Sequence, residues 1–359
     1  MDTFLHEAFI QLVRLGIGKS KDAKIPEKGI SWPEIRTLAE RHGLYAVVLD
    51  GIEKLLAPAR PPQEFLLEWI GEVLQGYEYQ YEQYCKVIAK LAEFYNSHGY
   101  KMMVLKGYAC SLDWPKPNHR PCGDIDIWLF GKQKEADAVL AKEKGIKVDK
   151  SHHHHTVFNW GDFMVENHYD FINVHHRKSN AKLEKILKEL GQNDTYTVDV
   201  NDEKVYLPSP NLHALFLIRH MVSHFASSEI SLRQVLDWAF FVEKHEKEID
   251  WDWLWNVVEK YHMKDFVNCI NAICVEELGF AASIFHGVQF VPELKDKVLE
   301  DIMSPAFGAE EPKYLIPRLI YKFHRWKGNA WKQDLCYTES RWSTFWSGVW
   351  SHLLKPKTI

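Results

Sequence analysis

The spacing of apolar residues predicts a helical region at the start of the chain. Ser31 has the form of an N-cap, Glu34 stands at the capping-box position, and the helix that follows would end near His42. Residues 63–98 then carry apolar side chains at helical intervals until a Ser-His-Gly stop signal. We therefore expect residues 1–99 to form an N-terminal helical region.

The middle of the chain changes to strand patterns, and helical periodicity returns from residue 208. The expected elements are strands at 102–105 and 125–130, a helix at 135–145, a β-hairpin of 153–160 and 163–171, and helices at 212–225 and 232–246. The predicted fold class is α+β. A small mixed-sheet core at 100–207 would lie between helical regions at 1–99 and 208–359.

Composition narrows the class of protein. The 359 residues are 46% hydrophobic and 26% charged with a formal net charge of −5, which argues against a strongly basic nucleic-acid binder. Six cysteines are scattered without CxxC pairs, as in an intracellular protein with free thiols. No signal peptide is evident and no apolar run reaches the ~18 residues of a membrane span. We expect a cytoplasmic protein without a membrane span.

The most informative segment is Gly-Asp-Ile-Asp-Ile, residues 123–127. Side chains alternate faces along a strand, so Asp124 and Asp126 would project to one side while Ile125 and Ile127 project to the other. Two carboxylates this close repel each other unless a cation lies between them. The spacing therefore predicts a divalent metal site.

Two further segments can contribute to such a site. Lys106 and Gly107 follow an apolar strand, where a turn could bring backbone N–H groups close to a phosphate. In the later hairpin, strand parity puts Glu166 on one face with Met164 and His168. Glu166 is a candidate third carboxylate, and Asp170 competes with it if the strand continues straight.

These residues carry a resemblance. Leu-Lys-Gly at 105–107, the Gly-Asp-Ile-Asp-Ile segment and Val-Glu-Asn-His-Tyr at 165–169 resemble the nucleotidyltransferase superfamily of the DNA polymerase β type. The chain is especially similar to the bacterial group labelled uncharacterised nucleotidyltransferase. The resemblance covers most of the chain, including the segment at 232–238. It implies that Asp124 and Asp126 are the metal-binding pair and Glu166 the third carboxylate.

The same resemblance implies where the nucleotide lies. Gly107 would face the triphosphate with Lys106 beside it, and Gly123 precedes the metal pair. Many superfamily members have a Gly-Ser pair at the turn, where this chain has Tyr108, so Ser111 is the candidate substitute for the missing hydroxyl.

Arginines and one further carboxylate complete the candidate nucleotide site. Arg120 could bind a phosphate bidentately or be an ordinary loop arginine. Arg233 and Asp237 stand at i and i+4 of a helix, where a local salt bridge is the plain expectation and a place in the nucleotide or acceptor pocket the alternative.

Two histidine groups and a tryptophan stripe remain. His152–His155 would alternate between the faces of a half-exposed strand, a poor arrangement for one metal site. His220 and His224 stand one helical turn apart without the glutamate of metal-dependent hydrolases, which favours a packing or surface role over a metal hydrolase. Trp342, Trp346 and Trp350 form a helical stripe that would pack on the core, with a membrane interface or a partner as alternatives.

The predicted function is transfer of a nucleoside monophosphate from a nucleoside triphosphate, ATP being favoured, to a hydroxyl acceptor with release of pyrophosphate. Mg²⁺ or Mn²⁺ would be the cofactor. A small molecule or a protein is favoured over nucleic acid as the acceptor. The alternative, motivated by Tyr108, is a catalytically inactive nucleotide-binding or protein-interaction module on the same fold.

Overall fold

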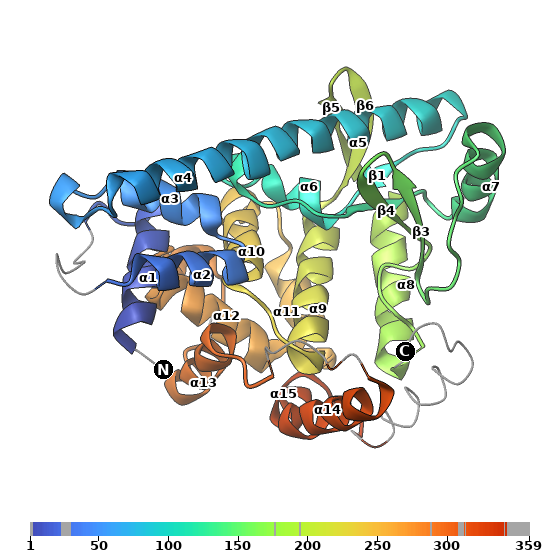
Figure 1. Cartoon of the computed structure of the whole chain (residues 1–359). Helices are drawn as coiled ribbons and strands as arrows, with labels where there is room; N and C mark the ends of the chain where they lie inside the picture. The colour runs from blue at the N-terminus through green and yellow to red at the C-terminus, as the bar shows by residue number, and fades with distance from the viewer. Residues whose placement is uncertain are drawn as a thin grey trace.

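The computed structural model describes residues 3–22, 30–175, 177–193, 195–287, 289–307, 312, 314–340 and 342. These residues form a six-stranded mixed sheet surrounded by helices (Figure 1), so the α+β fold class is confirmed.

The N-terminal region is helical, as predicted. Its α-helices are α1 (Thr3–Gly16), α2 (Trp32–His42), α3 (Tyr45–Glu53), α4 (Gln63–Val73) and α5 (Tyr79–Ser97), with a 3₁₀ turn at Ala57–Ala59. A π-helical segment, Leu74–Glu78, joins α4 to α5, and the three form the long rod across the top of Figure 1. The helix predicted over 63–98 is therefore confirmed, with a π-helical turn inside it.

Helix α2 begins and ends where the sequence predicts. Its C-terminus is closed by Gly43, whose φ of 65° lies in the left-handed region that glycine adopts without a steric penalty. Ser31 is the N-cap, but its side chain makes no capping hydrogen bond, so the predicted capping box is not formed.

The sheet has the strand order β3-β4-β2-β1-β6-β5. Its strands are β1 (Met103–Val104), β2 (Ile125–Trp128), β3 (His155–Trp160), β4 (Phe163–His168), β5 (Thr195–Val200) and β6 (Glu203–Pro208). β2 pairs with β4 and β1 with β6 in parallel, while the other three pairings are antiparallel. The hairpin predicted around Gly161 is confirmed as β3–β4.

The sequence patterns did not predict the elements between that hairpin and residue 208. Helix α8 (Lys178–Asn193) buries a narrow stripe that includes Leu183 and Leu187, and its remaining surface is mostly polar. The hairpin β5–β6 lies at the sheet edge with several exposed residues on β5, so its apolar alternation is weak.

The two faces of the sheet meet different helices. Ile125 and Ile127 share a hydrophobic core with α5 and with α7 (Gln133–Lys144). On the opposite face, the Trp128 ring contacts that of Phe171 with centroids 4.8 Å apart, and Phe171 contacts Phe216 of α9 at 5.8 Å. The aspartates that alternate with Ile125 and Ile127 therefore face α9.

The remaining helices follow the sheet. They are α9 (Pro210–Ser227), α10 (Leu232–His245), α11 (Trp251–Lys260), α12 (Lys264–Glu276), α13 (Pro292–Met303), α14 (Leu315–Gly328) and α15 (Ala330–Cys336), with a 3₁₀ turn at Ala282–Ile284. A second, larger hydrophobic core joins this region to α1–α4. None of the described helices is long and apolar enough to cross a membrane. Of the predicted tryptophan stripe, Trp346 and Trp350 lie outside the described residues.

Candidate functional site

Three carboxylates meet on the α9 face of the sheet. Asp126 of β2 is in parallel register with Glu166 of β4, and Asp124 lies two residues before Asp126 on the same face. Asp126 is only 2% exposed, whereas Asp124 and Glu166 are half-buried. The alternation predicted from the sequence thus places all three groups at one cavity, which they line together.

The competing carboxylate, Asp170, lies elsewhere. Strand β4 ends at His168, and the Asp170 side chain forms an ion pair with Lys188 of α8. It is not among the residues that line the cavity. The structure therefore brings Glu166, and not Asp170, to the aspartate pair.

Two basic side chains, Lys106 and His168, contact the carboxylates. The Nζ atom of Lys106 lies 2.7 Å from Asp126 Oδ1, and His168 Nε2 lies 2.9 Å from the same oxygen and 3.4 Å from Glu166 Oε2. Burial would raise the pKa of Asp126, but Lys106 and His168 hold it well below its usual range. Burial likewise opposes the charged form of His168, yet its hydrogen bonds to Asp126 and Glu166 raise its pKa.

His168 was not predicted as a site residue. The sequence placed it on the same strand face as Glu166, and this two-residue spacing was the signal for it. Ligand atoms of Asp126, Glu166 and His168 all lie within 4.8 Å of one another, a compact oxygen and nitrogen donor set that fits a divalent cation.

The start of α6 (Lys106–Ser111) is built tightly against this site. Lys106 has a φ of 32°, which is strained for a residue with a side chain. A Cβ on Gly107 would lie 2.6 Å from the hydroxyl oxygen of Tyr84, which donates a hydrogen bond to the backbone oxygen of Asp124. Glycine is thus required here by a close approach to the protein itself, and Gly107 also lines the cavity.

Ser111 does not lie at the cavity. Its hydroxyl is fully buried, donates to the backbone oxygen of Tyr108 at 2.7 Å and lies 2.9 Å from the Tyr81 hydroxyl. The structure thus does not bring Ser111 to the three carboxylates, whereas Gly123 does line the cavity beside them.

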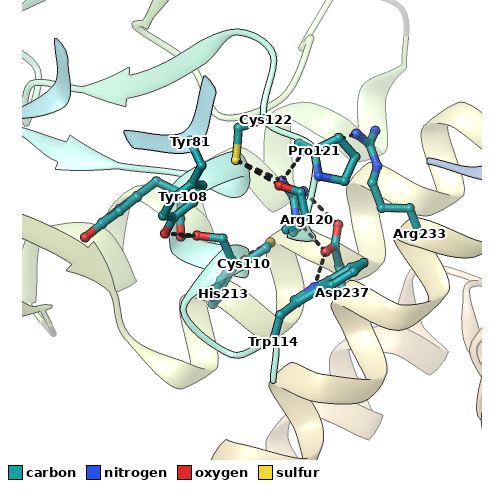
Figure 2. Close-up of polar contacts among 11 residues, drawn as sticks. Tyr81, Tyr108, Cys110, Trp114, Arg120, Pro121, Cys122, His213, Arg233 and Asp237 are labelled. Atoms are coloured by element: carbon teal, nitrogen blue, oxygen red, sulfur yellow. Dashed lines mark hydrogen bonds and ion pairs between the residues drawn. The ribbon is translucent and has the colours of Figure 1, made fainter. Parts of the chain in front are cut away.

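Arg120 and Asp237 form a buried ion pair across the cavity wall (Figure 2). Arg120 donates to the two Asp237 carboxylate oxygens at 2.7 and 2.9 Å, and Trp114 Nε1 donates to Asp237 at 2.9 Å. The salt bridge expected between Arg233 and Asp237 is wrong, because Asp237 is bound bidentately by an arginine 117 residues away.

Arg233 consequently has no anionic partner among the described residues. Figure 2 shows it beside Pro121, whose backbone oxygen is a distant acceptor at 3.5 Å, and its Nε is buried without a hydrogen bond. Burial and the nearby Arg120 charge lower the pKa of Arg233. A guanidinium that lines a cavity without a carboxylate is suited to an anionic ligand.

The loop that carries Arg120 is anchored to the N-terminal helices. His119 is buried, with Nδ1 2.7 Å from Asp50 Oδ2 and Nε2 3.0 Å from Glu78 Oε1. Burial opposes its charged form, but these carboxylates raise the pKa of His119. Lys116 also pairs with Asp50 at 2.5 Å, so two residues of the loop contact the same carboxylate.

The cavity measures about 420 Å³, within the range of small-molecule sites. Its opposite wall is α9, which contributes His220 and His224. Their ring centroids are 4.4 Å apart, and burial lowers the pKa of the His220 imidazole. The sequence favoured a packing or surface role for this pair over a metal hydrolase; His224 is exposed, and both histidines line the cavity.

The histidine run also differs from its prediction. Only His155 belongs to strand β3, whereas His152, His153 and His154 precede it in a bend. The predicted alternation over two faces is therefore wrong, and His154 and His155 both line the cavity.

Comparison with known proteins identifies the family, whereas the similar solved structures have low TM-scores. Residues 28–279 match the family described as uncharacterised nucleotidyltransferase. A nucleotidyltransferase-like antigenic protein from Paracoccidioides brasiliensis is similar over 56% of this chain and 96% of its own, at 15% identity and a TM-score of 0.34. A chain of a tRNA-processing enzyme complex is similar over 71% of this chain and 83% of its own, at 12% identity and a TM-score of 0.24.

No curated protein matches the chain. The family match spans the three carboxylates, the start of α6, the Arg120 loop and the Arg233 helix, which are the parts that build the cavity. The chain belongs to the uncharacterised nucleotidyltransferase family.

Proposed function

We propose that this protein is a metal-dependent nucleotidyltransferase that uses ATP and Mg²⁺, or Mn²⁺ in its place. The observation that carries the proposal is the parallel register of Asp126 with Glu166, with Asp124 on the same face of the sheet. Three carboxylates at one cavity form the oxygen-rich donor set that Mg²⁺ prefers. The family assignment supports the same reaction class.

Asp124 and Asp126 would hold the metal ions, and Glu166 would complete the donor set. Bound there, the metal supplies charge neutralisation for the phosphate oxygens and acidifies a coordinated hydroxyl. Burial opposes ionisation of Glu166, but its hydrogen bond from His168 lowers its pKa. An ionised Glu166 can accept the proton of the acceptor hydroxyl, whose oxygen bonds to the α-phosphorus as the bond to pyrophosphate breaks.

Arg233 and Lys106 would bind the triphosphate. Arg233 lines the cavity without an anionic partner among the described residues. A bound phosphate would form the charge-assisted hydrogen bonds that its guanidinium lacks. Lys106 is the first residue of α6, and its ammonium reaches Asp126 in the cavity. From there it can contact a phosphate that approaches Gly107. Arg120 and Asp237 bind each other, which favours a role in holding the cavity wall over direct phosphate binding.

The acceptor would enter between the carboxylates and α9. His220 and His224 line that wall, and the lowered pKa of His220 makes its imidazole a neutral hydrogen-bonding group. A cavity of about 420 Å³ suits a small hydroxyl compound or a protein side chain better than a folded nucleic acid.

Isothermal titration of a non-hydrolysable ATP analogue, with and without Mg²⁺, tests the binding step. We expect Mg²⁺-dependent binding that is lost in the Asp124→Asn/Asp126→Asn double variant. Asp162→Asn, in the exposed hairpin turn, is the matched control and should bind as the wild type does. Binding that ignores Mg²⁺ or survives the double substitution would refute the proposed site.

A second measurement separates turnover from binding. Pyrophosphate release from ATP is followed across a panel of hydroxyl acceptors, with Glu166→Gln as the variant that removes the proton acceptor. Release that depends on the acceptor and falls in Glu166→Gln supports transfer. Normal nucleotide binding with no release for any acceptor would instead favour an inactive nucleotide-binding module.

A further inference from the structure

Three histidines meet where β3 begins and β4 ends. His155 and His168 are directly opposite in the antiparallel ladder, with ring centroids 5.2 Å apart, and His154 precedes them in the chain. The His154 ring lies 4.4 Å from that of His155 and 5.5 Å from that of His168. One ring nitrogen from each can be chosen so that all three lie within 4.8 Å of one another.

Several of these nitrogens are buried without a partner. His155 is 7% exposed, yet neither its Nδ1 nor its Nε2 makes a hydrogen bond, and Nδ1 of His154 is also buried and unbonded. Leaving a buried polar atom unsatisfied costs about 1–3 kcal/mol. Such atoms are rare in native proteins, and a bound ion is one of the physical explanations for them.

The three histidines offer nitrogen ligands, whereas Asp124 and Asp126 offer oxygen ligands. Imidazole nitrogen binds Zn²⁺, Co²⁺ and related first-row cations well, whereas Mg²⁺ prefers oxygen ligands. Glu166 lies between the two groups, with Oε1 3.6 Å from His155 Nε2 and Oε2 3.4 Å from His168 Nε2.

We propose that His154, His155 and His168, with Glu166 as a carboxylate ligand, form a binding site for one first-row transition-metal cation such as Zn²⁺ or Co²⁺. This site adjoins the proposed Mg²⁺ position and shares Glu166 with it, but its nitrogen ligands are separate from Asp124 and Asp126. It belongs to the free protein and does not depend on nucleotide binding or transfer.

Co²⁺ is the probe, because nitrogen ligation at low coordination number gives it intense visible absorption. Metal-free full-length protein is titrated with Co²⁺ without nucleotide, and Zn²⁺ is then added to displace it. We expect one equivalent of tightly bound Co²⁺. His154→Gln and His155→Gln should each weaken its binding about tenfold or more, since each removes a ligand.

His286→Gln is the matched control. Its imidazole is half exposed and pairs with Glu246 away from the cavity, so its loss should leave Co²⁺ binding unchanged. Far-UV circular dichroism checks that each variant is folded. His154 is only half-buried, so His154→Gln decides the result if the buried His155 variant unfolds.

Asp124→Asn separates this inference from the proposed function. Asp124 is outside the histidine group, so the variant should keep Co²⁺ binding while it loses Mg²⁺-dependent ATP-analogue binding. Histidine-dependent Co²⁺ binding without nucleotide binding would sustain the metal site and refute the transferase. Absence of the visible bands, or bands unchanged in folded His154 and His155 variants, would overturn the metal site alone.

Discussion

The buried ion pair between Arg120 and Asp237 gives a quantitative prediction about stability: Asp237→Asn should strongly destabilise the fold. The Asp237 carboxylate accepts two hydrogen bonds from Arg120 and one from Trp114. The side chains of the ion pair are only 6% and 7% exposed. An amide keeps the size of the side chain but removes the negative charge that balances the guanidinium.

The expected loss follows from that burial. Removing one partner of a buried pair leaves an uncompensated charge in a poorly solvated position, which costs about 3–5 kcal/mol. The neighbouring Arg233 adds a second positive charge that no described carboxylate pairs with. By contrast, Glu259 forms an exposed pair with Lys264, and Glu259→Gln should cost less than about 1 kcal/mol.

Urea unfolding followed by tryptophan fluorescence measures both substitutions. The double variant Arg120→Met/Asp237→Asn removes both charges and keeps an acceptor for Trp114, so it should be more stable than Asp237→Asn alone. An Asp237→Asn loss below about 1 kcal/mol, or a double variant no more stable than the single one, would show that this pair is not desolvated as the structure indicates.

Three further changes test other parts of the site. Arg233→Met should weaken Mg²⁺-dependent ATP-analogue binding by about 1.5–3 kcal/mol, because it removes a charged phosphate donor, and an unchanged titration would exclude that role. Gly107→Ala should destabilise the protein by about 1–3 kcal/mol through a clash with Tyr84, and Tyr84→Phe should relieve part of that loss in a double-mutant cycle of urea midpoints. His119 has a raised pKa in the folded state despite its burial, because of its two carboxylate partners. The free energy of unfolding that protonated His119 adds is therefore fully present below its unfolded-state pKa of about 6.5, and is lost as the pH rises through its folded-state pKa. The difference in unfolding free energy between wild type and His119→Gln should therefore shrink from about pH 6 to pH 8.5, and a constant difference would contradict the assignment.

The sequence predicted those features that depend on local periodicity. Alternation within Ile125–Trp128 was enough to put Asp124 and Asp126 on one face. Parity in the following hairpin put Glu166 on the face of Met164 and His168 but left Asp170 as a competitor, and the family resemblance favoured Glu166. The long helix before the sheet was equally evident, because its apolar positions repeat over many turns.

Contacts between residues that are far apart in the sequence could not be predicted from local spacing. Asp237 lies one helical turn from Arg233, so local spacing favoured that pair, yet the fold supplies Arg120 from 117 residues away. The histidine run was misplaced because its strand begins only at His155, and element boundaries are set by tertiary pairing more than by composition. Helix α8 was missed because most of its surface is polar.

Several residues that line the cavity have conformations or burial that are unfavourable in free energy, and their presence at one place indicates a functional site. Lys106 has a strained backbone, Asp126 is a carboxylate buried to 2% exposure, Arg233 lines the cavity without a described anionic partner, and His155 buries two unbonded nitrogens. The strained backbone, the Arg233 charge without a described anionic partner and the unbonded His155 nitrogens each cost folding free energy. A fold retains such costs where they hold groups in position for a ligand. The Lys106 ammonium, 2.7 Å from Asp126 Oδ1, balances the buried carboxylate charge and lines the cavity where a phosphate would bind.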